Sequence, residues 1–329
     1  MNISIIGGSG FIGTRLASRL SDGNYSFNII DKVISQSFPT LTRRADVRSL
    51  DDLNGVISDS SILINLAAEH RDDVSPLSLY DDVNVQGAIN ICAVANSKNI
   101  TKIIFTSSVA VYGFAPLNTG EDGEISPFND YGRTKYEAEV IFRKWQIEDF
   151  ANRTLVIIRP TVVFGEKNRG NVYNLLSQMC KKQFVMVGNG ENRKSMAYVE
   201  NIAAFIEYSL RANPGVHTYN YVDKPDFTMN NLVSHVQNLL GKSPNTNIRI
   251  PYFLGIVIGK CFDMASTIFN IKFVISGIRV KKFCSNSVYA TNVDNTGFIR
   301  PVTLLDAIGN TVKYEFLERH SSDQIFFSE

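Results

Sequence analysis

Short apolar runs alternate with helix-like segments through the first half of this 329-residue chain. The runs are rich in Ile, Val and Leu, and they lack the apolar–polar alternation of strands in a half-exposed sheet. Continuous apolar strands separated by helices indicate a parallel sheet that helices cover on both faces. The sequence therefore predicts a doubly wound α/β fold. The runs occur at 2–8, 27–31, 62–68, 102–108 and 154–160.

The turn after the first run is rich in glycine. The segment IIGGSGFIG spaces Gly7, Gly10 and Gly13 three residues apart, directly before the helical pattern FIGTRLASRL. Glycine is required where a strand turns sharply into a helix whose backbone N–H groups approach a pyrophosphate. Asp31 closes the next strand, and a carboxylate there accepts hydrogen bonds from ribose hydroxyls and repels a 2′-phosphate. These features predict a Rossmann domain that prefers NAD to NADP.

Beyond residue 165 the alternation gives way to mixed helices, loops and short strands. One more strand candidate, VHTYNYVD at 216–223, is expected to return to the sheet. We therefore expect an NAD-binding Rossmann domain over residues 1–165. A smaller, discontinuous, mixed α/β substrate domain is expected over residues 166–329.

Charge and cysteine content exclude several classes of protein. The chain has 33 Lys and Arg against 32 Asp and Glu, and a net charge of +1 provides no field for binding nucleic acid. Its four cysteines form no CxxC pair, which favours free thiols in a reducing compartment over a disulfide framework or a zinc site. The first residues lack the basic region and apolar core of a signal peptide, so export is not expected.

One apolar stretch, at 251–276, needs a separate explanation. Lys260 and Asp263 interrupt it, so it is not expected to span a bilayer. Two interpretations stay open. The stretch is either a pair of core helices or a surface helix that meets a membrane or a lipid substrate.

A second group of polar residues follows the run at 102–108. Ser108 ends this run, while Tyr131 and Lys135 are four residues apart and share one face of a predicted helix. A phenol with a pKa near ~10 is a poor base at neutral pH. A nearby ammonium and a positive nicotinamide ring favour the phenolate, and Ser108 can hydrogen-bond the same substrate hydroxyl.

These motifs, in this order, resemble the extended short-chain dehydrogenase/reductases, specifically their NAD-dependent epimerase/dehydratase group. The resemblance covers nearly the whole chain and rests on GGSGFIG, IID, DVR, NLAA, VNVQG, TSSVAVYG, YGRTK and RPTVVFG. It implies NAD as the cofactor and Ser108, Tyr131 and Lys135 as the catalytic residues. Asp46 is expected either to reach the adenine or to cap a helix. The implied cofactor contacts are Gly7, Gly10, Phe11, Ile12, Gly13, Asp31, Asp46, Val47, Leu66, Ala67, Ala68, Asn84, Tyr131, Lys135 and Pro160.

The residues after Ser108 narrow the reaction. Dehydratases of the group carry an Asp-Glu pair there, and this chain has Val109 and Ala110, which cannot transfer protons. Dehydration is therefore disfavoured, as is decarboxylation, which needs a carboxylate at this place. A 4-epimerase needs only the residues present, because hydride passes from C4 of the sugar to NAD and returns to the other face.

The substrate end departs from the UDP-sugar epimerases of the group. Lys194 stands where those enzymes usually carry Arg, and their RPGD segment is missing. AAEHRDDVSP, NRGNVYNLL, KSMAYV and IRVKKFC instead resemble a bacterial branch that acts on GlcNAc carried by undecaprenyl diphosphate, in O-antigen assembly. The resemblance implies a lipid-linked sugar diphosphate substrate, a cytoplasmic protein in peripheral contact with the inner membrane surface, and a homodimer. The expected substrate contacts are His70, Arg71, Ser108, Arg169, Asn171, Lys194 and Arg279.

The charged cluster in AAEHRDDVSP follows the strand end at 62–68, where cofactor and substrate should meet. A metal site is disfavoured, because the reaction needs no metal and Glu69, His70 and Asp72 are too close in sequence to surround one ion. Asp72 and Asp73 are expected to brace the loop or cap the next helix. A solvated loop here, and a solvated surface role for Arg169 and Arg279, stay open.

Three other functions compete with the lipid-linked epimerase. A soluble UDP-GlcNAc or UDP-Glc 4-epimerase would use the same chemistry on another carrier. A 4-ketosugar reductase would use the same Ser, Tyr and Lys, although Asp31 argues against the NADPH that such enzymes often prefer. A non-catalytic dinucleotide sensor would not need Ser108, Tyr131 and Lys135 together.

Overall fold

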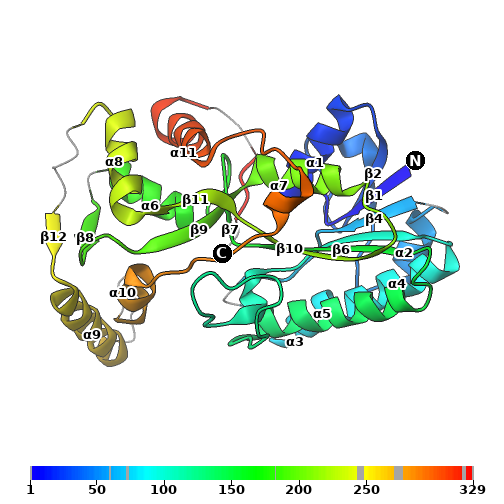
Figure 1. Cartoon of the computed structure of the whole chain (residues 1–329), viewed down its shortest axis with the longest axis horizontal. Coiled ribbons are helices and arrows are strands. Elements are labelled where there is room, and N and C mark those ends of the chain that lie inside the picture. Colours follow the sequence, from blue (N-terminus) through cyan, green and yellow to red (C-terminus); the bar gives the residue numbers. More distant parts are fainter. Residues whose placement is uncertain are drawn as a thin grey trace.

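Seven parallel strands form one sheet in the larger part of the molecule (Figure 1). In spatial order they are β10 (Gly215–Tyr221), β6 (Thr154–Pro160), β5 (Lys102–Thr106), β4 (Ser61–Asn65), β1 (Asn2–Ile6), β2 (Ser26–Asp31) and β3 (Thr42–Arg44). The computed structural model describes residues 2–58, 61–71, 74–181, 183–242, 248–269, 277–320 and 324–327.

The predicted doubly wound α/β fold is confirmed. Strands β1, β2, β4, β5 and β6 lie on the five apolar runs, and β10 overlaps the strand candidate at 216–223 that was expected to return to the sheet. All seven residues of β6 are buried, as expected of a strand with helices on both faces. The order of strands reverses between β1 and β4, so the carboxyl ends of these strands border the crevice where such folds bind ligands.

Helices cover the two faces of this sheet in separate layers. Helices α1 (Phe11–Asp22) and α7 (Val199–Ser209) pack on one face, with Leu16 and Phe205 in their shared core. Helices α2 (Leu50–Val56), α4 (Gly87–Ser97) and α5 (Asp130–Ile147) pack on the other, around Trp145. The two layers appear above and below the sheet in Figure 1. Their packing holds the strand ends that carry the site.

A second, smaller group of elements packs at the other end of the molecule. The sheet of β7 (Val162–Phe164), β9 (Arg193–Tyr198) and β11 (Asp223–Thr228) is mixed, because β9 runs parallel to β7 and antiparallel to β11. Its core includes apolar residues of α6 (Asn171–Cys180), α8 (Met229–Leu239) and α11 (Leu304–Val312). Strands β8 (Val185–Val187) and β12 (Ile248–Ile250) pair in parallel. The division of the chain into domains at residue 165 stays a prediction.

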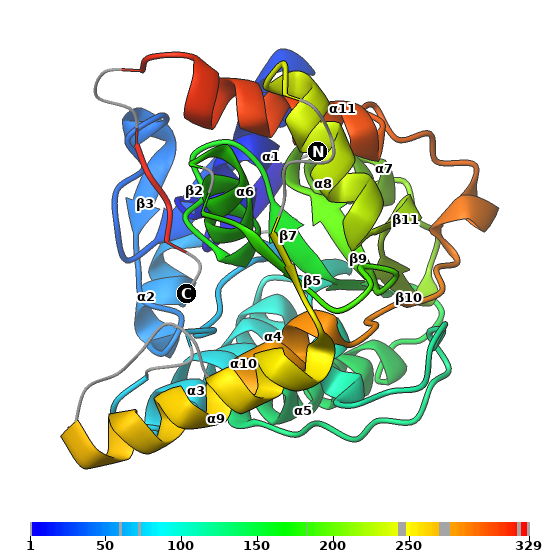
Figure 2. The ribbon, with the colours of Figure 1, turned by 90° about the vertical axis from the view of Figure 1, so that its left-hand side faces the viewer.

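The apolar stretch at 251–276 forms a surface helix in its described part. Helix α9 (Tyr252–Phe269) packs against α10 (Gly277–Cys284) and runs along the outer edge of the molecule (Figure 2). Phe253 is 64% exposed and Val257 is 54% exposed, which contradicts the core-helix interpretation for this half of α9. Residues 270–276 lie outside the described residues. No helix in the described part of the chain is long and apolar enough to span a membrane.

Short helical turns join these elements. Among them, η3 (Val109–Tyr112) follows β5, while α3 (Ser78–Tyr80) and the π-helix η2 (Asp81–Gln86) precede α4. The remaining turns are η1 (Pro39–Leu41), η4 (Val293–Thr296) and the π-helix η5 (Lys313–Leu317).

Candidate active site

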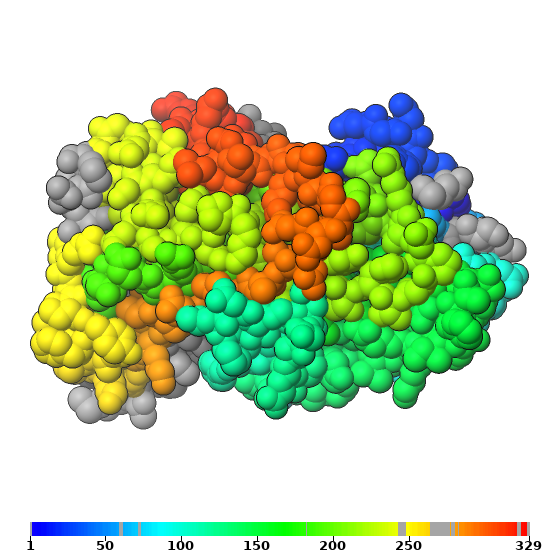
Figure 3. Space-filling model, in the orientation of Figure 1, coloured from blue at the N-terminus to red at the C-terminus, as the bar shows by residue number. Residues whose placement is uncertain are grey.

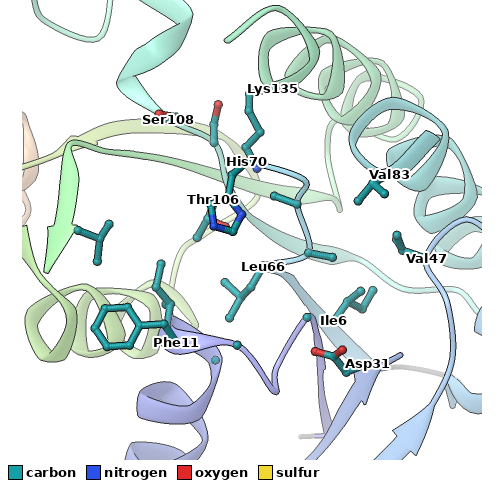
Figure 4. A pocket seen from close by; sticks show the side chains of 18 of the residues that line it. Ile6, Phe11, Asp31, Val47, Leu66, His70, Val83, Thr106, Ser108 and Lys135 are labelled. Carbon is teal, nitrogen blue, oxygen red and sulfur yellow. The ribbon is translucent and has the colours of Figure 1, made fainter. Parts of the chain in front are cut away.

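The carboxyl ends of β1, β2, β4, β5 and β6 surround a pocket of about 370 Å³ (Figure 4). It brings together most of the residues that the sequence singled out, although they come from positions 7 to 160 of the chain. Parallel strands explain this convergence, because their carboxyl ends all lie at one edge of the sheet. The predicted residues that line the pocket are Gly7, Gly10, Phe11, Ile12, Gly13, Asp31, Asp46, Val47, Leu66, Ala67, Ala68, His70, Ser108, Tyr131, Lys135 and Pro160.

The glycine loop leaves room for a ligand at one position only. A Cβ on Gly7, whose φ is +77°, would lie 2.5 Å from the Ala67 nitrogen. A Cβ on Gly13 would lie 2.5 Å from the Gly8 Cα. At Gly10 the nearest protein atom would be the Gly7 oxygen at 3.4 Å, so the space beside Gly10 belongs to the pocket. This cradle before α1 fits a pyrophosphate.

Two carboxylates occupy the end of the pocket beyond the glycine loop. Asp31 accepts hydrogen bonds from the backbone N–H groups of Ser9 at 3.0 Å and Val33 at 3.1 Å, and its side chain points to the pocket in Figure 4. Asp46 pairs with Arg48 at 2.7 Å, and this guanidinium lowers the pKa of Asp46. The cap of α2 is Ser49, whose side chain accepts from Asp52 N, so the alternative role of Asp46 as a helix cap is wrong.

Ser108, Tyr131 and Lys135 line the far side of the pocket. Ser108 caps η3 by accepting from the Ala110 N–H at 3.1 Å, and its hydroxyl also hydrogen-bonds Tyr131. Asn129 caps α5, which presents Tyr131 in its first turn and Lys135 in its second. The end of β5 and the start of α5 therefore place the Ser108 hydroxyl, the Tyr131 phenol and the Lys135 amine around the same pocket.

Burial governs the ionisation of this group. It raises the pKa of Tyr131, while the hydrogen bond from Ser108 lowers it. Lys135 is 1% exposed and its Nζ lies 4.5 Å from the centre of the Phe105 ring. Burial lowers the pKa of Lys135 to about 7, against the opposing charge of Glu139. The protein thus holds an amine that titrates close to neutral pH next to its candidate base.

His70 reaches the pocket because Asn84 fixes the residue before it. The Asn84 side chain accepts from the Glu69 N–H at 2.9 Å, and it donates to the Glu69 carbonyl at 3.0 Å and to Thr134 Oγ1 at 3.0 Å. The His70 ring lines the same pocket as Lys135 (Figure 4), and desolvation lowers the pKa of His70. Asn84 itself is not among the lining residues, and its expected contact with the cofactor stays a prediction.

The rest of the charged cluster is arranged around an ion pair. Arg71 lies 3.0 Å from Glu69 and is half exposed outside the pocket lining. Asp72 and Asp73 lie outside the described residues. Among the residues that the structure describes, no three His, Cys, Asp or Glu side chains are grouped to hold a metal ion.

Arg169, Asn171 and Lys194 are not among the residues that line this pocket. Arg169 pairs with Glu315 at 2.8 Å and stacks on the Tyr173 ring at 4.1 Å. Asn171 is exposed at the start of α6, and Lys194 lies on β9, where burial lowers its pKa. Arg279 belongs to α10, and its side chain lies outside the described residues. Their roles in binding substrate stay predictions.

The structure adds pocket residues that sequence reasoning missed. Thr106 ends β5 and Ser107 follows it, Thr161 follows β6, and Asn168 lies in the loop after β7. The first three had a signal, because polar residues at strand ends face the ligand crevice. Asn168 had none, since its loop follows a strand of the other sheet.

A glycine cradle, an Asp-ended second strand and a Ser/Tyr/Lys group at one edge of a doubly wound sheet define a dinucleotide-dependent enzyme class. Residues 3–221 match the NAD dependent epimerase/dehydratase family, and the chain belongs to this family. The predicted family and cofactor, NAD, are thereby confirmed, as is an enzymatic rather than a sensing role.

Comparison with known proteins extends this result over the whole chain. The chain is 47% identical, over 100% of its length and 99% of the relative's, to the N-acetyl-alpha-D-glucosaminyl-diphospho-ditrans,octacis-undecaprenol 4-epimerase of Escherichia coli O157:H7. It is 25% identical to the UDP-glucose 4-epimerase of Vibrio cholerae, over 81% of this chain and 84% of that one. The UDP-glucuronic acid 4-epimerase of Bacillus cereus, solved in complex with NAD, shares the fold with a TM-score of 0.72. It is 19% identical, over 95% of this chain and 98% of that one.

Proposed function

We propose that this protein is an NAD-dependent 4-epimerase that interconverts GlcNAc- and GalNAc-diphospho-undecaprenol for surface-polysaccharide assembly. The observation that carries the proposal is the 47% identity to an enzyme of that name over the full chain. That identity includes the half in which the sequence departs from UDP-sugar epimerases. The Ser108, Tyr131 and Lys135 group supplies the chemistry that such a reaction needs.

Tyr131 acts as the general base and acid at the C4 hydroxyl. Its phenol loses a proton only where positive charge offsets the effect of burial, which raises its pKa. Lys135 in its charged form contributes part of this stabilisation, and the Ser108 hydroxyl hydrogen-bonds the phenol. The glycine loop and Asp31 would hold NAD, which when bound would supply a positive ring able to take up hydride from C4 and give it back. After each cycle Tyr131 has its proton back and the chain is unchanged.

His70 is positioned to bind the substrate beside this group. Asn84 holds the Glu69 backbone through both its N–H and its carbonyl group. The His70 ring lines the pocket together with Lys135. Its lowered pKa keeps the imidazole neutral at physiological pH, so that it can both donate and accept hydrogen bonds to sugar hydroxyls. Arg71 can reach the sugar diphosphate only by leaving Glu69.

The lipid carrier is proposed to enter from the α9 side of the molecule. A second pocket at the start of α9 is lined by Arg249, Lys281 and Tyr252, which offer positive charge beside an aromatic ring. Guanidinium and ammonium groups suit diphosphate oxygens. From there Phe253 and Val257 continue an exposed apolar face along α9, one helical turn apart.

This apolar face is the proposed membrane contact. Leu254 and Ile258, both 41% exposed, widen the face, and Tyr252 at 45% is the kind of side chain that favours a membrane–water interface. Peripheral contact with the inner membrane surface would present the pocket to a substrate whose tail stays in the lipid. Figure 3 shows α9 and its neighbours forming one outer end of the molecule.

A homodimer is part of the proposal. Helices α4 and α5 pack side by side on one face of the sheet, and Ile89 on α4 is 44% exposed. Two copies would bury this surface by pairing their α4 and α5 helices. Light scattering on the purified protein tests this, with twice the mass of one chain as the expected result.

The function is tested with purified protein and GlcNAc-diphospho-undecaprenol in detergent, with no reduced cofactor added. Sugars are released by mild acid and identified. We expect GalNAc to appear. The final ratio of GlcNAc to GalNAc should be the same whether the reaction starts from the GlcNAc-linked or the GalNAc-linked lipid. No conversion of GlcNAc, together with oxidation of one NADH or NADPH per molecule of a supplied 4-keto sugar, would identify a 4-ketosugar reductase instead. No conversion by NAD-loaded protein would refute the proposal.

A further inference from the structure

A segment near the end of the chain returns to the cofactor pocket. In residues 324–327, which we call the strap, the Phe326 N–H donates to the Lys167 carbonyl at 2.8 Å. The Arg169 N–H in turn donates to the Phe326 carbonyl at 2.8 Å. These two bonds form a parallel bridge between the strap and the loop after β7. The strap is thereby paired to the loop that carries Asn168 into the pocket lining.

The side chains of the strap face two ways. Ile325 and Phe327 point to solvent, with 44% and 70% of their surface exposed. Phe326 points inward and packs on Phe11, with ring centres 5.7 Å apart. Phe11 is the first residue of α1, directly after Gly10, and lines the pocket (Figure 4). One residue of the strap therefore contacts both walls of the pocket.

The loop after β7 forms one wall of the pocket, and a second residue from the last part of the chain, Glu315, also holds it in place. Glu315, with its side chain 3% exposed, accepts from the Lys167 N–H at 2.6 Å and pairs with Arg169 at 2.8 Å. On its other side Glu166 accepts from the Tyr198 hydroxyl at 3.0 Å and pairs with Arg15 of α1. Strap and Glu315 both lie outside residues 3–221, the part matched by the family.

We propose that the strap closes the cofactor pocket by tying the glycine-loop wall to the loop after β7, and so slows the release of NAD. Phe326 is a positioning residue in this arrangement, because it acts on the pocket through Phe11 and Asn168. In a redox-neutral cycle the cofactor is needed again at once, so slow release keeps oxidation and reduction on the same enzyme molecule. The inference rests on NAD as cofactor and is independent of the sugar carrier.

The test measures exchange of bound NAD for labelled NAD on the purified holoenzyme. We expect Phe326→Ala to exchange at least tenfold faster than the unaltered protein. Phe327→Ala, next to it in the chain but facing solvent, should stay within twofold. With saturating NAD, kcat of Phe326→Ala should stay within twofold while the NAD concentration for half-maximal activity rises at least fivefold.

Two further measurements separate this role from a general loss of stability. If Phe326→Ala does not fold, Phe326→Leu keeps an apolar contact and should exchange at an intermediate rate. In a double variant with Phe11→Leu, Phe326→Leu should increase the rate of NAD exchange by a smaller factor than it does alone, because both residues belong to one contact. Exchange by Phe326→Ala within twofold of the unaltered protein would overturn the proposal, and a lower thermal midpoint beside it would show that the strap is purely structural. Equal acceleration by Phe327→Ala would overturn it as well.

Discussion

The two ends of the molecule bury their apolar residues in opposite ways. Strand β6 has all seven residues buried under helices on both faces, whereas Phe253 and Val257 of the apolar helix α9 are mostly exposed. The candidate catalytic residues belong to the first end, whereas the exposed apolar face of α9 and the second pocket beside it belong to the other. The sheet therefore carries the candidate redox site, whereas the surface helix α9 is the proposed contact for the carrier of the sugar. Each prediction below changes one of these ends and leaves the other intact.

The largest effect is expected at Tyr131. Replacing Tyr131 by Phe removes the only phenolic proton in the Ser/Tyr/Lys group and should lower kcat by about 10²–10⁴-fold. The bound NAD content should not change, since the ring remains. Tyr136→Phe, on the same helix and outside the pocket lining, serves as the control and should keep kcat within twofold. Retained epimerase activity in Tyr131→Phe would end the catalytic assignment.

The next effect concerns Lys135 and pH. Its pKa is about 7 in the folded protein against 10.5 for an ordinary Lys, so between these values the unfolded chain binds more protons. The free energy of unfolding should therefore rise with pH in this window, by up to about 1.4 kcal/mol per pH unit. Lys135→Met removes this titration.

The measurement is chemical denaturation from pH 6.5 to 9.5 on NAD-free protein. The difference between the unaltered protein and Lys135→Met isolates the Lys135 contribution from other groups. A difference that does not vary with pH would show that Lys135 keeps an ordinary pKa despite its burial.

A smaller effect distinguishes two glycines of the same loop. Gly13→Ala places a methyl group against the Gly8 backbone and should lower the free energy of unfolding by about 1–3 kcal/mol. Gly10→Ala has room within the protein and should change it by less than about 0.5 kcal/mol. Because its methyl group enters the pocket, Gly10→Ala should instead weaken NAD binding about tenfold or more, measured by titration calorimetry. An equal loss of stability in both variants would contradict the claim that only Gly10 has free space beside it.

The smallest effect on chemistry is expected at α9. The double variant Phe253→Glu, Val257→Glu should lose co-sedimentation with anionic vesicles, because it puts two charges on the proposed membrane face. Its kcat on substrate dispersed in detergent should stay within twofold. Phe150→Glu, an equally exposed aromatic position in the loop after α5 (74% exposed), is the control and should bind vesicles normally. Undiminished vesicle binding by the double variant would exclude α9 as the contact.

The Rossmann part of the fold was predictable because its signals are local. Each buried strand is a continuous apolar run, and parallel strands bring their ends to one edge, so spacing alone placed Gly10, Asp31 and Ser108 in one pocket. The exposure of α9 was not predictable, since a mostly apolar helix interrupted by only Lys260 and Asp263 fits a core as well as a surface.

Contacts between segments that are far apart in the sequence could not be predicted either. The ion pair of Arg169 with Glu315 is one such contact, because nothing near either residue in the sequence indicates it. Asn84 resembles a cofactor contact, and only the structure shows that it holds the Glu69 backbone. The contact of Phe326 with Phe11 is likewise a long-range contact that no sequence pattern indicates.

The most direct test of the central claim compares the two sugar carriers on one enzyme preparation. NAD-loaded protein is given GlcNAc-diphospho-undecaprenol and UDP-GlcNAc in parallel, and kcat/KM for formation of the GalNAc product is measured for each. We predict a value at least a hundredfold higher for the lipid-linked sugar. A higher value for UDP-GlcNAc would contradict the account and identify a nucleotide-sugar epimerase.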